Sequence, residues 1–314
     1  METRKIGRLD ATIVGIGCNN FGRRLDADAA AKVVNAALEA GVTFFDSADV
    51  YGSGQSEEYL GRALGKRRNQ AVIATKYSKP MEGQGQGAGP AYIRKAVEAS
   101  LRRLGTDHID LYQQHDPDPS VPIEETLGAL NELVKAGKAL EIACSNFSSA
   151  QIREADDAAK RKHTARFVSV QNEYSLFVRD PEKDVLPECE RLGLAFLPYY
   201  PLASGLLTGK YRKGQPAPQG TRITNATNSK WLTDENLTVV EALVKFAEAH
   251  NHTLLELAFG WLLAHRPVAS VIAGAMNPVQ VKANAASAGW RLSPADLTEI
   301  DKLMAQAATN SVAK

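Results

Sequence analysis

The residues TFFDSADVY, which run from Thr43 to Tyr51, hold the pattern that decides the fold. Thr43, Phe44 and Phe45 are β-prone and mostly apolar, so they predict a short buried strand. Asp46 follows at once, where the apolar run gives way to a polar loop, and Tyr51 comes five residues later. A polar pair at the carboxyl end of a buried strand is typical of α/β enzymes. An N-cap aspartate and a surface tyrosine are the alternative on these residues alone.

Similar β-prone runs recur along the chain, most of them about 30 residues apart. Eight such runs separated by helical patterns favour an α/β fold of the closed type, a (β/α)8 TIM barrel. An open doubly wound sheet is the structural alternative. The expected strands are Thr12–Gly17, Thr43–Asp46, Val72–Lys76, Ile109–His115, Ala139–Ser145, Phe167–Gln171, Leu194–Tyr199 and Ser270–Gly274.

Amphipathic helical patterns fill the gaps between these strands. In one of them, Ile93, Val97, Leu101 and Leu104 fall on a single helix face, and Gly105 follows as the end of the helix. Ser148 is the expected N-cap of another helix. The helices expected in the first half of the chain are Asp26–Ala40, Pro90–Leu104 and Pro122–Ala136.

Two segments break this rhythm. The glycine-rich run Gly83–Gly89 (GQGQGAG) matches neither the GxGxxG nor the Walker pattern, so it predicts a flexible loop and not a phosphate cradle. The seventh and eighth strands are separated by about 70 residues. This interval predicts extra helices over Asp234–Ala249 and Thr253–His265, and a long loop, Gly209–Thr233, that we expect to be a lid.

The composition narrows the class of protein. The chain has 314 residues, with 37 Lys and Arg against 36 Asp and Glu, so its formal net charge is +1. No basic stripe is present, and we expect no nucleic-acid partner. Three cysteines without a CxxC pair, and the lack of a signal peptide or an apolar run of membrane length, indicate a cytoplasmic protein with no membrane segment. One barrel domain over residues 1–314 accounts for the length.

Polar side chains end most of the expected strands. Each one taken singly is readily explained as a cap or a turn residue. Together they lie at the carboxyl face of one barrel, which is where barrel enzymes have their active sites. These residues are Asp46 with Tyr51 beyond it, Lys76, His115, Ser145 with Asn146, Gln171 with Asn172, and Tyr199.

Four of these residues suit the protonation of a developing alkoxide. A tyrosine phenol has an ordinary pKa near 10, and an ammonium held by a carboxylate would lower the pKa of Tyr51. Lys76 and Asp46 can supply that pair, while His115 can orient a carbonyl oxygen by a hydrogen bond. No metal-ligand spacing and no nucleophile with its base are visible. Because no side chain supplies a hydride, the chemistry implies a nicotinamide cofactor.

At this point the sequence closely resembles the aldo-keto reductase family, in the family's order and over nearly the whole chain. The segment Phe45–Leu64 (FDSADVYGSGQSEEYLGRAL) resembles the first signature, and VIATK and IDLYQQHDPD supply the family's lysine and histidine. The resemblance extends to segments that bind the cofactor. These are Cys144–Ile152, Val168–Leu176, Leu197–Tyr211 and Val271–Ser287.

The resemblance also implies roles for individual residues. Tyr51 is similar to the family's general acid, Lys76 and Asp46 to the pair that activates it, and His115 to the residue that orients the substrate. The expected partners of the nicotinamide carboxamide are Ser145, Asn146 and Gln171, with Tyr199 stacked on the ring. The residues expected to border the cofactor are Gly17, Cys18, Asn19 and Asp46. Those expected along the pyrophosphate are Leu202, Gly205, Leu206 and Lys210. Those expected around the adenosine are Gly274, Met276, Gln280 and Asn284.

Two departures from the family pattern concern the cofactor. Ala273 stands where many members have proline, and Gln280 stands where many have an arginine that meets the 2′-phosphate. We therefore expect NADP(H), with NAD(H) as a weaker alternative. The TGKY segment and the long seventh loop resemble the bacterial and potassium-channel-subunit branches of the family.

The resemblance implies an NADP(H)-dependent oxidoreductase that reduces an aldehyde or ketone reversibly. The alternative is a cofactor-binding regulatory subunit of the channel β-subunit type, although only about a dozen residues precede the first expected strand, which is too few for an inactivation arm. We expect a small-molecule substrate, a carbonyl compound or an alcohol that is bulky and carries some polar groups. The sequence implies no oligomeric state. The expected pocket walls are Asn19, Asn20, Phe21, Tyr77, the 116–120 loop and the 209–233 loop, with Trp231.

Overall fold

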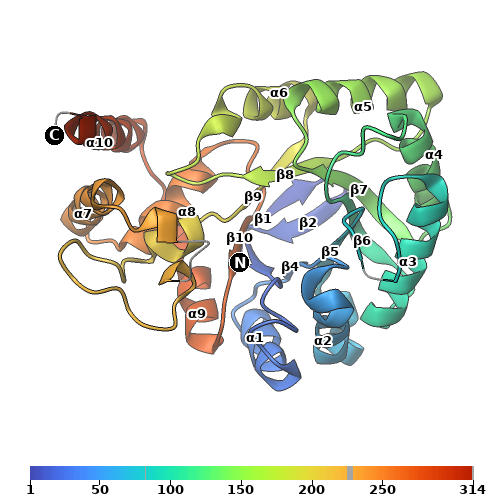
Figure 1. The fold of residues 1–314 in the computed structure, drawn as a ribbon, viewed down its shortest axis with the longest axis horizontal. Coiled ribbons are helices and arrows are strands. Elements are labelled where there is room, and N and C mark those ends of the chain that lie inside the picture. The colour runs from blue at the N-terminus through green and yellow to red at the C-terminus, as the bar shows by residue number, and fades with distance from the viewer. Residues whose placement is uncertain (82, 225–228, 313–314) are drawn as a thin grey trace. The chain divides into compact units, whose positions relative to one another are not determined.

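The computed structural model describes residues 1–81, 83–224 and 229–312 (Figure 1). The chain divides into two compact units, which are described separately. The first unit comprises Met1–Glu173, Asp180–Tyr199 and Arg266–Ala285, and the second comprises Tyr174–Arg179, Tyr200–His265 and Ala286–Lys314. The expectation of a single domain stays a prediction. Among the described residues, no helix combines the length and the apolar character that crossing a membrane requires.

The first unit is built on eight parallel strands in a nearly closed barrel, as the sequence predicts (Figure 1). Each of the first six strands pairs with the next along the chain, and the last strand pairs with the first, while the seventh and eighth are not paired as a ladder. The remaining gap is bridged by two backbone hydrogen bonds, from Phe196 N–H to Pro267 O and from Ala269 N–H to Phe196 O. The strands are β3 (Val14–Gly17), β4 (Phe44–Asp46), β5 (Val72–Tyr77), β6 (Ile109–Gln114), β7 (Ala139–Ser145), β8 (Ser169–Glu173), β9 (Ala195–Tyr199) and β10 (Val271–Gly274).

The sequence analysis misses a two-stranded hairpin that precedes the barrel. Strands β1 (Thr3–Ile6) and β2 (Leu9–Thr12) pair antiparallel across a two-residue turn in which Gly7 has a φ of 57°. Thr12 was expected to begin the first barrel strand, but it ends β2. Its hydroxyl donates to Val14 O and accepts from the N–H groups of Thr43 and Phe44, so it joins the hairpin to the barrel.

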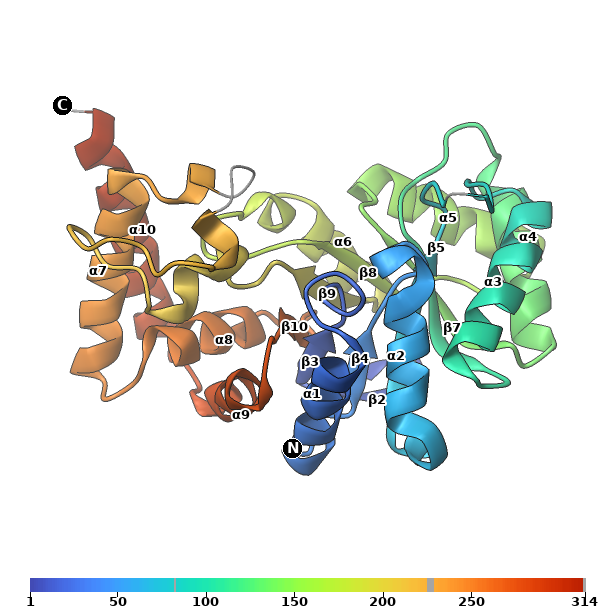
Figure 2. The same ribbon diagram turned by 60° about the horizontal axis from the view of Figure 1, so that its bottom comes forward.

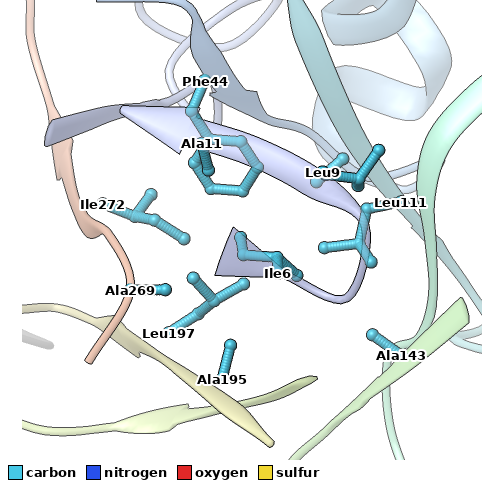
Figure 3. Close-up of a cluster of buried hydrophobic side chains, with 11 residues drawn as sticks. Ile6, Leu9, Ala11, Phe44, Leu111, Ala143, Ala195, Leu197, Ala269 and Ile272 are labelled. Carbon is cyan, nitrogen blue, oxygen red and sulfur yellow. The ribbon is translucent and has the colours of Figure 1, made fainter. Parts of the chain in front are cut away.

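The hairpin fills one end of the barrel with apolar side chains. Ile6, Leu9 and Ala11 pack into a buried cluster with inward-facing residues of the barrel, and Ile6 lies in the middle of that cluster (Figure 3). Burial of this apolar surface stabilises both the hairpin and the barrel. The barrel residues of the cluster are Phe44, Ala74, Leu111, Ala143, Ala195, Leu197, Ala269 and Ile272.

The same cluster explains where the polar residues of the next layer lie. Side chains alternate between the two faces of a strand, so a residue two positions after an inward-facing one also faces inward. Phe44 is thus followed by Asp46, and Ala74 by Lys76. The apolar layer at one end of the barrel therefore predicts a polar layer nearer the carboxyl ends of the strands.

Helices follow the strands in the order that the sequence predicts. Asp26 caps α1 by accepting from Ala29 N–H, and Ser148 forms a capping box with Gln151 at the start of α5. The sequence analysis did not locate α2 and α6. The helices of the first unit are α1 (Ala27–Glu39), α2 (Gln55–Leu64), α3 (Pro90–Leu104), α4 (Ile123–Lys135), α5 (Ser149–Lys162), α6 (Val185–Leu192) and α9 (Pro278–Ala286, whose last residue belongs to the second unit). Its 3-10 turns are η1 (Tyr51–Gly54), η2 (Gly65–Gln70) and η3 (Asp180–Glu182).

The second unit is helical and holds the long segment after β9. Thr253 caps α8 in a capping box with Glu256, close to the start that the sequence predicts. The expected lid, residues 209–233, contains two short 3-10 turns, while residues 225–228 lie outside the described part of the chain. The elements are η4 (Ala203–Thr208), η5 (Arg222–Thr224), η6 (Ser229–Trp231), α7 (Asp234–Ala249), α8 (Leu254–Ala264), η7 (Ser287–Gly289) and α10 (Pro294–Val312).

The hairpin plug is open to a direct test. Ile6→Ala is expected to lower the free energy of unfolding by about 2–4 kcal/mol, because it leaves a cavity among side chains that are fully buried. Urea unfolding followed by circular dichroism measures this loss. Thr3→Ala, on the exposed side of the same hairpin, is the control and should stay within about 0.5 kcal/mol of the wild type. Equal effects of the two substitutions would show that the hairpin does not stabilise the barrel.

Candidate active site

A buried ion pair lies at the centre of the polar layer. The Lys76 Nζ atom is 2.7 Å from Asp46 Oδ1 and 2.8 Å from Asp46 Oδ2, and it also donates to the backbone oxygen of Ser47 at 2.8 Å. The Lys76 side chain is fully buried. Its three ammonium hydrogens have three acceptors, so the charge is removed from water without an unsatisfied donor.

Two glutamine amides complete the surroundings of Asp46. Gln113 Nε2, from β6, and Gln171 Nε2, from β8, each donate to Asp46 Oδ1 at 3.1 Å. The sequence analysis expected Gln171 to bind a nicotinamide, and it did not consider Gln113. The signal for Gln113 was its place two residues before His115, which puts both side chains on the inner face of β6.

Tyr51 lies beside this ion pair. It begins the 3-10 turn η1 directly after the loop that follows β4, and it is half-buried. The Lys76 Nζ atom is 5.3 Å from the centre of the Tyr51 ring, and the His115 ring meets the Tyr51 ring edge to face at 6.0 Å. The structure therefore brings together the four residues for which the sequence analysis expected catalytic roles.

His115 is held as a neutral imidazole. Burial, followed by the positive charges of Lys76 and Lys79, lowers the pKa of His115 to about 2. Its Nδ1 atom is buried and has no hydrogen-bond partner among the described residues. Above about pH 3 the ring can offer one donor and one acceptor without adding a second positive charge beside Lys76.

The residues expected around the nicotinamide are already bonded to one another. Ser145 Oγ donates to Gln171 O at 2.7 Å, and the Tyr199 hydroxyl donates to Asn146 Oδ1 at 2.9 Å. Asn146 Nδ2 donates to His115 O and to Asp116 Oδ1. Both N–H groups of the Asn146 amide are therefore engaged, and Asn146 can meet a ligand through the second lone pair of Oδ1.

The end of β3 lies directly beside Asp46, because Gly17 is its register partner, and β10 pairs with β3 on the other edge. Gly17 pairs with Gly274 in parallel register, and a Cβ atom on Gly274 would lie 3.5 Å from Asn20 Nδ2 and 3.7 Å from Asn19 Oδ1. The Cys18 thiol is buried, and burial together with the charge of Asp46 raises its pKa. The whole residue is buried, so its expected contact with a cofactor stays a prediction.

The three remaining residues of the expected adenosine site lie in and just before α9. The side-chain amide of Gln280 is already engaged, because its Oε1 accepts from Met276 N–H at 2.8 Å. Its own N–H donates to Asn277 Oδ1 at 3.0 Å. Asn284 is buried, and its Nδ2 atom has no hydrogen-bond partner among the described residues.

Leu202, Gly205, Leu206 and Lys210 belong to the second unit, and their expected contact with a pyrophosphate stays a prediction. Within that unit they lie in and around the turn η4. Gly205 has a φ of 104°, and a Cβ atom there would lie 3.7 Å from Lys210 Nζ. The positive φ favours glycine at this position, whereas 3.7 Å is an ordinary contact distance that a Cβ atom would tolerate.

Two residues expected to line a substrate pocket are enclosed in protein. Phe21 and Tyr77 are fully buried, and Tyr77 stacks on Tyr112 with a distance of 4.9 Å between ring centres. Residues one or two positions past a strand can face the core as readily as a pocket, and the sequence does not distinguish the two.

Asp49 is a buried carboxyl group that the sequence analysis missed. Neither of its carboxylate oxygens has a hydrogen-bond partner among the described residues. Burial, followed by the nearby charge of Glu57, raises the pKa of Asp49 to about 7. Glu57, by contrast, accepts from Thr75 Oγ1 and from Arg103 Nε.

Comparison with known proteins agrees with the fold. The sequence profile of the Aldo/keto reductase family matches residues 13–305. A probable voltage-gated potassium channel subunit beta from Oryza sativa subsp. japonica is 37% identical over 295 residues, which is 90% of each chain. An aldo-keto reductase from Bacillus subtilis (strain 168) is 35% identical over 307 residues, covering 94% of this chain and 91% of the relative.

A solved structure of an enzyme is similar to this chain over nearly its whole length. The glycerol dehydrogenase from Gluconobacter oxydans has a TM-score of 0.84 at 31% identity, and the match covers 98% of this chain and 96% of the other. Fold and comparisons together define an oxidoreductase built on a TIM barrel. The chain belongs to the aldo/keto reductase family.

The buried Asp49 predicts a dependence of stability on pH. Because the pKa of Asp49 is higher in the folded state (about 7) than in an unfolded chain (near 4), its contribution to stability is lost as pH rises from about 4 to above 7. Asp49→Asn should therefore raise the free energy of unfolding by about 1–3 kcal/mol at pH 8 and change it little at pH 4. Urea unfolding at both pH values measures the difference.

Asp157→Asn, on the exposed face of α5, is the matched control and should show no pH-dependent gain. A gain for Asp49→Asn that is the same at pH 4 and pH 8 would contradict a raised pKa.

Proposed function

We propose that the protein reduces aldehydes or ketones to alcohols, reversibly, with NADP(H) as its cofactor. The observation that carries the proposal is the buried Lys76 ammonium, fixed by Asp46 and 5.3 Å from the ring centre of Tyr51. An ammonium beside a phenol favours the phenolate form, which makes the phenol a better proton donor. The family match supports an oxidoreductase, and the small-molecule carbonyl or alcohol substrate is part of our proposal.

In this proposal Tyr51 moves one proton. Its hydroxyl gives the proton to the carbonyl oxygen during reduction and takes it back from the alcohol during oxidation. His115 is neutral, so it can hydrogen-bond the same oxygen without adding charge, while Asp46 keeps the Lys76 ammonium in place. A bound nicotinamide would supply the hydride that no side chain can supply.

The residues present fit a dinucleotide. Gly17 and Gly274 leave the ends of β3 and β10 without side chains, beside the amides of Asn19 and Asn20. The buried Asn284 Nδ2 lacks a partner among the described residues, as expected of a donor that meets a ligand. Ser145, Asn146 and Gln171 would hold the carboxamide and Tyr199 would stack on the ring. The residues proposed for the pyrophosphate are Leu202, Gly205, Leu206 and Lys210, and those for the adenosine are Met276, Gln280 and Asn284.

A second candidate function is supported by the relatives named as channel subunits. The 37% identity to a probable potassium channel subunit beta leaves open a cofactor-binding regulatory subunit. The two candidates differ in turnover. The reductase consumes NADPH with a suitable aldehyde or ketone, whereas a subunit that acts only through its partner binds the cofactor without turnover.

Tyr51→Phe tests the proposed reaction. With a panel of aldehydes, ketones and secondary alcohols and either NADPH or NADP+, we expect the wild type to turn over at least one compound. The variant should lose about 10²–10⁴-fold in kcat and keep its affinity for NADPH, because only the proton donor is removed. Stopped-flow absorbance at 340 nm gives the rate of the chemical step.

Tyr59→Phe, which removes a phenol hydroxyl from α2, is the control and should retain wild-type activity. If Tyr51→Phe keeps more than about half of the wild-type rate, Tyr51 is not the proton donor.

Gln280→Arg tests the proposed adenosine end. An arginine can make bidentate, charge-assisted bonds to a 2′-phosphate, whereas Gln280 has only neutral donors and uses its Oε1 on Met276 N–H. The substitution should tighten NADPH binding by about 1–2 kcal/mol and leave NADH nearly unaffected. Fluorescence titration of both cofactors measures this.

Val279→Arg places the same charge one position earlier, on a side chain that is 76% exposed, and should not discriminate between the cofactors. A wild-type preference for NADH, or an equal gain for both cofactors in Gln280→Arg, would refute this assignment.

A further inference from the structure

A cationic groove lies between α2 and α3 of the first unit, and none of its lining residues has a part in the proposed reaction. Its volume is about 660 Å³, and its walls include Arg62, Lys95, Arg102 and Arg103 with one carboxylate, Glu58. Arg103 is ion-paired with the buried Glu57, so the other three cations against Glu58 leave a local net charge of +2, in a chain whose formal net charge is +1. The walls of this groove therefore carry an excess of positive charge.

The helices bring these side chains together from two sides. Helices α2 and α3 are neighbours in Figure 2 and pack tightly where a Cβ atom on Gly61 would lie 2.2 Å from Leu104 O. Lys95 and Arg102 are seven residues apart on α3, which places them on one face two turns apart. Arg62 faces the same groove from α2.

Two of the four cations have no protein partner in the part of the chain that the structure describes. Among the described residues, the side chains of Arg62 and Arg102 make no hydrogen bond or ion pair, and Glu58, one turn before Arg62, makes no ion pair with it. Many other arginines are paired within 3.2 Å of a carboxylate. Examples are Arg68 with Asp110, Arg153 with Glu188 and Arg212 with Glu241. The guanidinium groups of Arg62 and Arg102 are thus available to an anion.

The other two cations are held in position. Arg103 donates from Nε to Glu57 at 2.7 Å and from Nη2 to Ser100 at 3.2 Å. Lys95 Nζ donates to the backbone oxygen of Gln84, which belongs to the glycine-rich loop. Side chains already fixed lose less conformational entropy when a ligand binds, so these bonds prepare the groove.

We propose that this groove binds a small molecule that carries two or more phosphate groups. Guanidinium groups match phosphate oxygens bidentately, and the volume lies within the range of small-ligand sites and exceeds the need of a single phosphate. Ser53 and Gln84, which also line the groove, supply neutral polar groups for the remaining oxygens. The concave shape favours a small ligand over a nucleic-acid duplex, which needs an extended basic stripe.

The glycine-rich loop Gly83–Gly89 gains a role in this proposal. The sequence analysis gave it no phosphate site, because it lacks a phosphate-binding motif. In the structure its Gln84 forms part of a wall whose charge comes from α2 and α3. The site therefore depends on side chains from three segments, and no local sequence pattern encodes it.

The test is isothermal titration calorimetry of the full chain with sodium pyrophosphate, with and without saturating NADPH. NADPH is included because a dinucleotide pocket could also take pyrophosphate. The wild type should bind with one site per chain in both conditions. The Arg62→Gln/Arg102→Gln double variant should bind at least about 30-fold more weakly, since two charge-assisted contacts are lost.

The Lys135→Gln/Lys162→Gln variant is the matched control, because it removes two exposed charges from α4 and α5 of the same unit. It should bind pyrophosphate as the wild type does. Circular dichroism melts of all three proteins show that they are folded.

Three results would overturn the proposal. One is the absence of binding by the wild type, and another is equal binding by the two double variants. The third is binding that NADPH abolishes. If a duplex oligonucleotide binds through Arg62 and Arg102 while pyrophosphate does not, the groove serves a nucleic acid and the small-molecule assignment is wrong.

Discussion

The ion pair between Lys76 and Asp46 organises the first unit at the carboxyl ends of its strands. A carboxylate and an ammonium removed from water are costly, and their attraction compensates for this only when the geometry is good and the remaining donors and acceptors are satisfied. Here Asp46 Oδ1 accepts from Lys76, Gln113 and Gln171 together. These four residues come from β4, β5, β6 and β8, so one buried charge ties four strand ends. Loss of either charged partner alone would leave the other buried and unpaired, which typically costs about 3–5 kcal/mol.

Two aspartates three residues apart show how surroundings decide the state of a carboxyl group. Asp46 accepts hydrogen bonds from an ammonium and two amides. Asp49 has no hydrogen bond to its carboxylate oxygens among the described residues and has Glu57 nearby, so its pKa rises to about 7. His115 is the counterpart, a base kept neutral by burial and by the charge of Lys76. The ion pair between Lys76 and Asp46 thus carries the charge of this layer. His115 stays neutral beside it, and Asp49 has a pKa of about 7.

Much of this arrangement was predictable from residue spacing alone. The eight strands follow from short apolar runs, and the polar layer follows from the two-residue period that takes Phe44 to Asp46 and Ala74 to Lys76. The hairpin β1–β2 was missed because Thr12 extends an apolar run across a bend in the chain. The hydrogen bond from Met276 N–H to Gln280 depends on local loop geometry. The burial of Asp49 without a hydrogen-bond partner among the described residues depends on long-range packing. Residue spacing predicts neither. The cationic groove could not be predicted either. Its cations come from two amphipathic helices, α2 and α3, and neither helix alone has a pattern that indicates a binding site.

The N-terminal hairpin has a consequence for how the protein is made on the ribosome. Ile6 and Leu9 are synthesised well before some of the side chains that cover them, which include Leu197, Ala269 and Ile272. At roughly 5–20 residues per second, about fifteen to fifty seconds separate the emergence of the hairpin from that of its last neighbours. During this interval the apolar residues of the nascent chain are exposed without their final contacts. The hairpin, residues 3–12, is therefore the part of the first unit that waits longest for its final contacts. During that time its apolar side chains must be kept from aggregating.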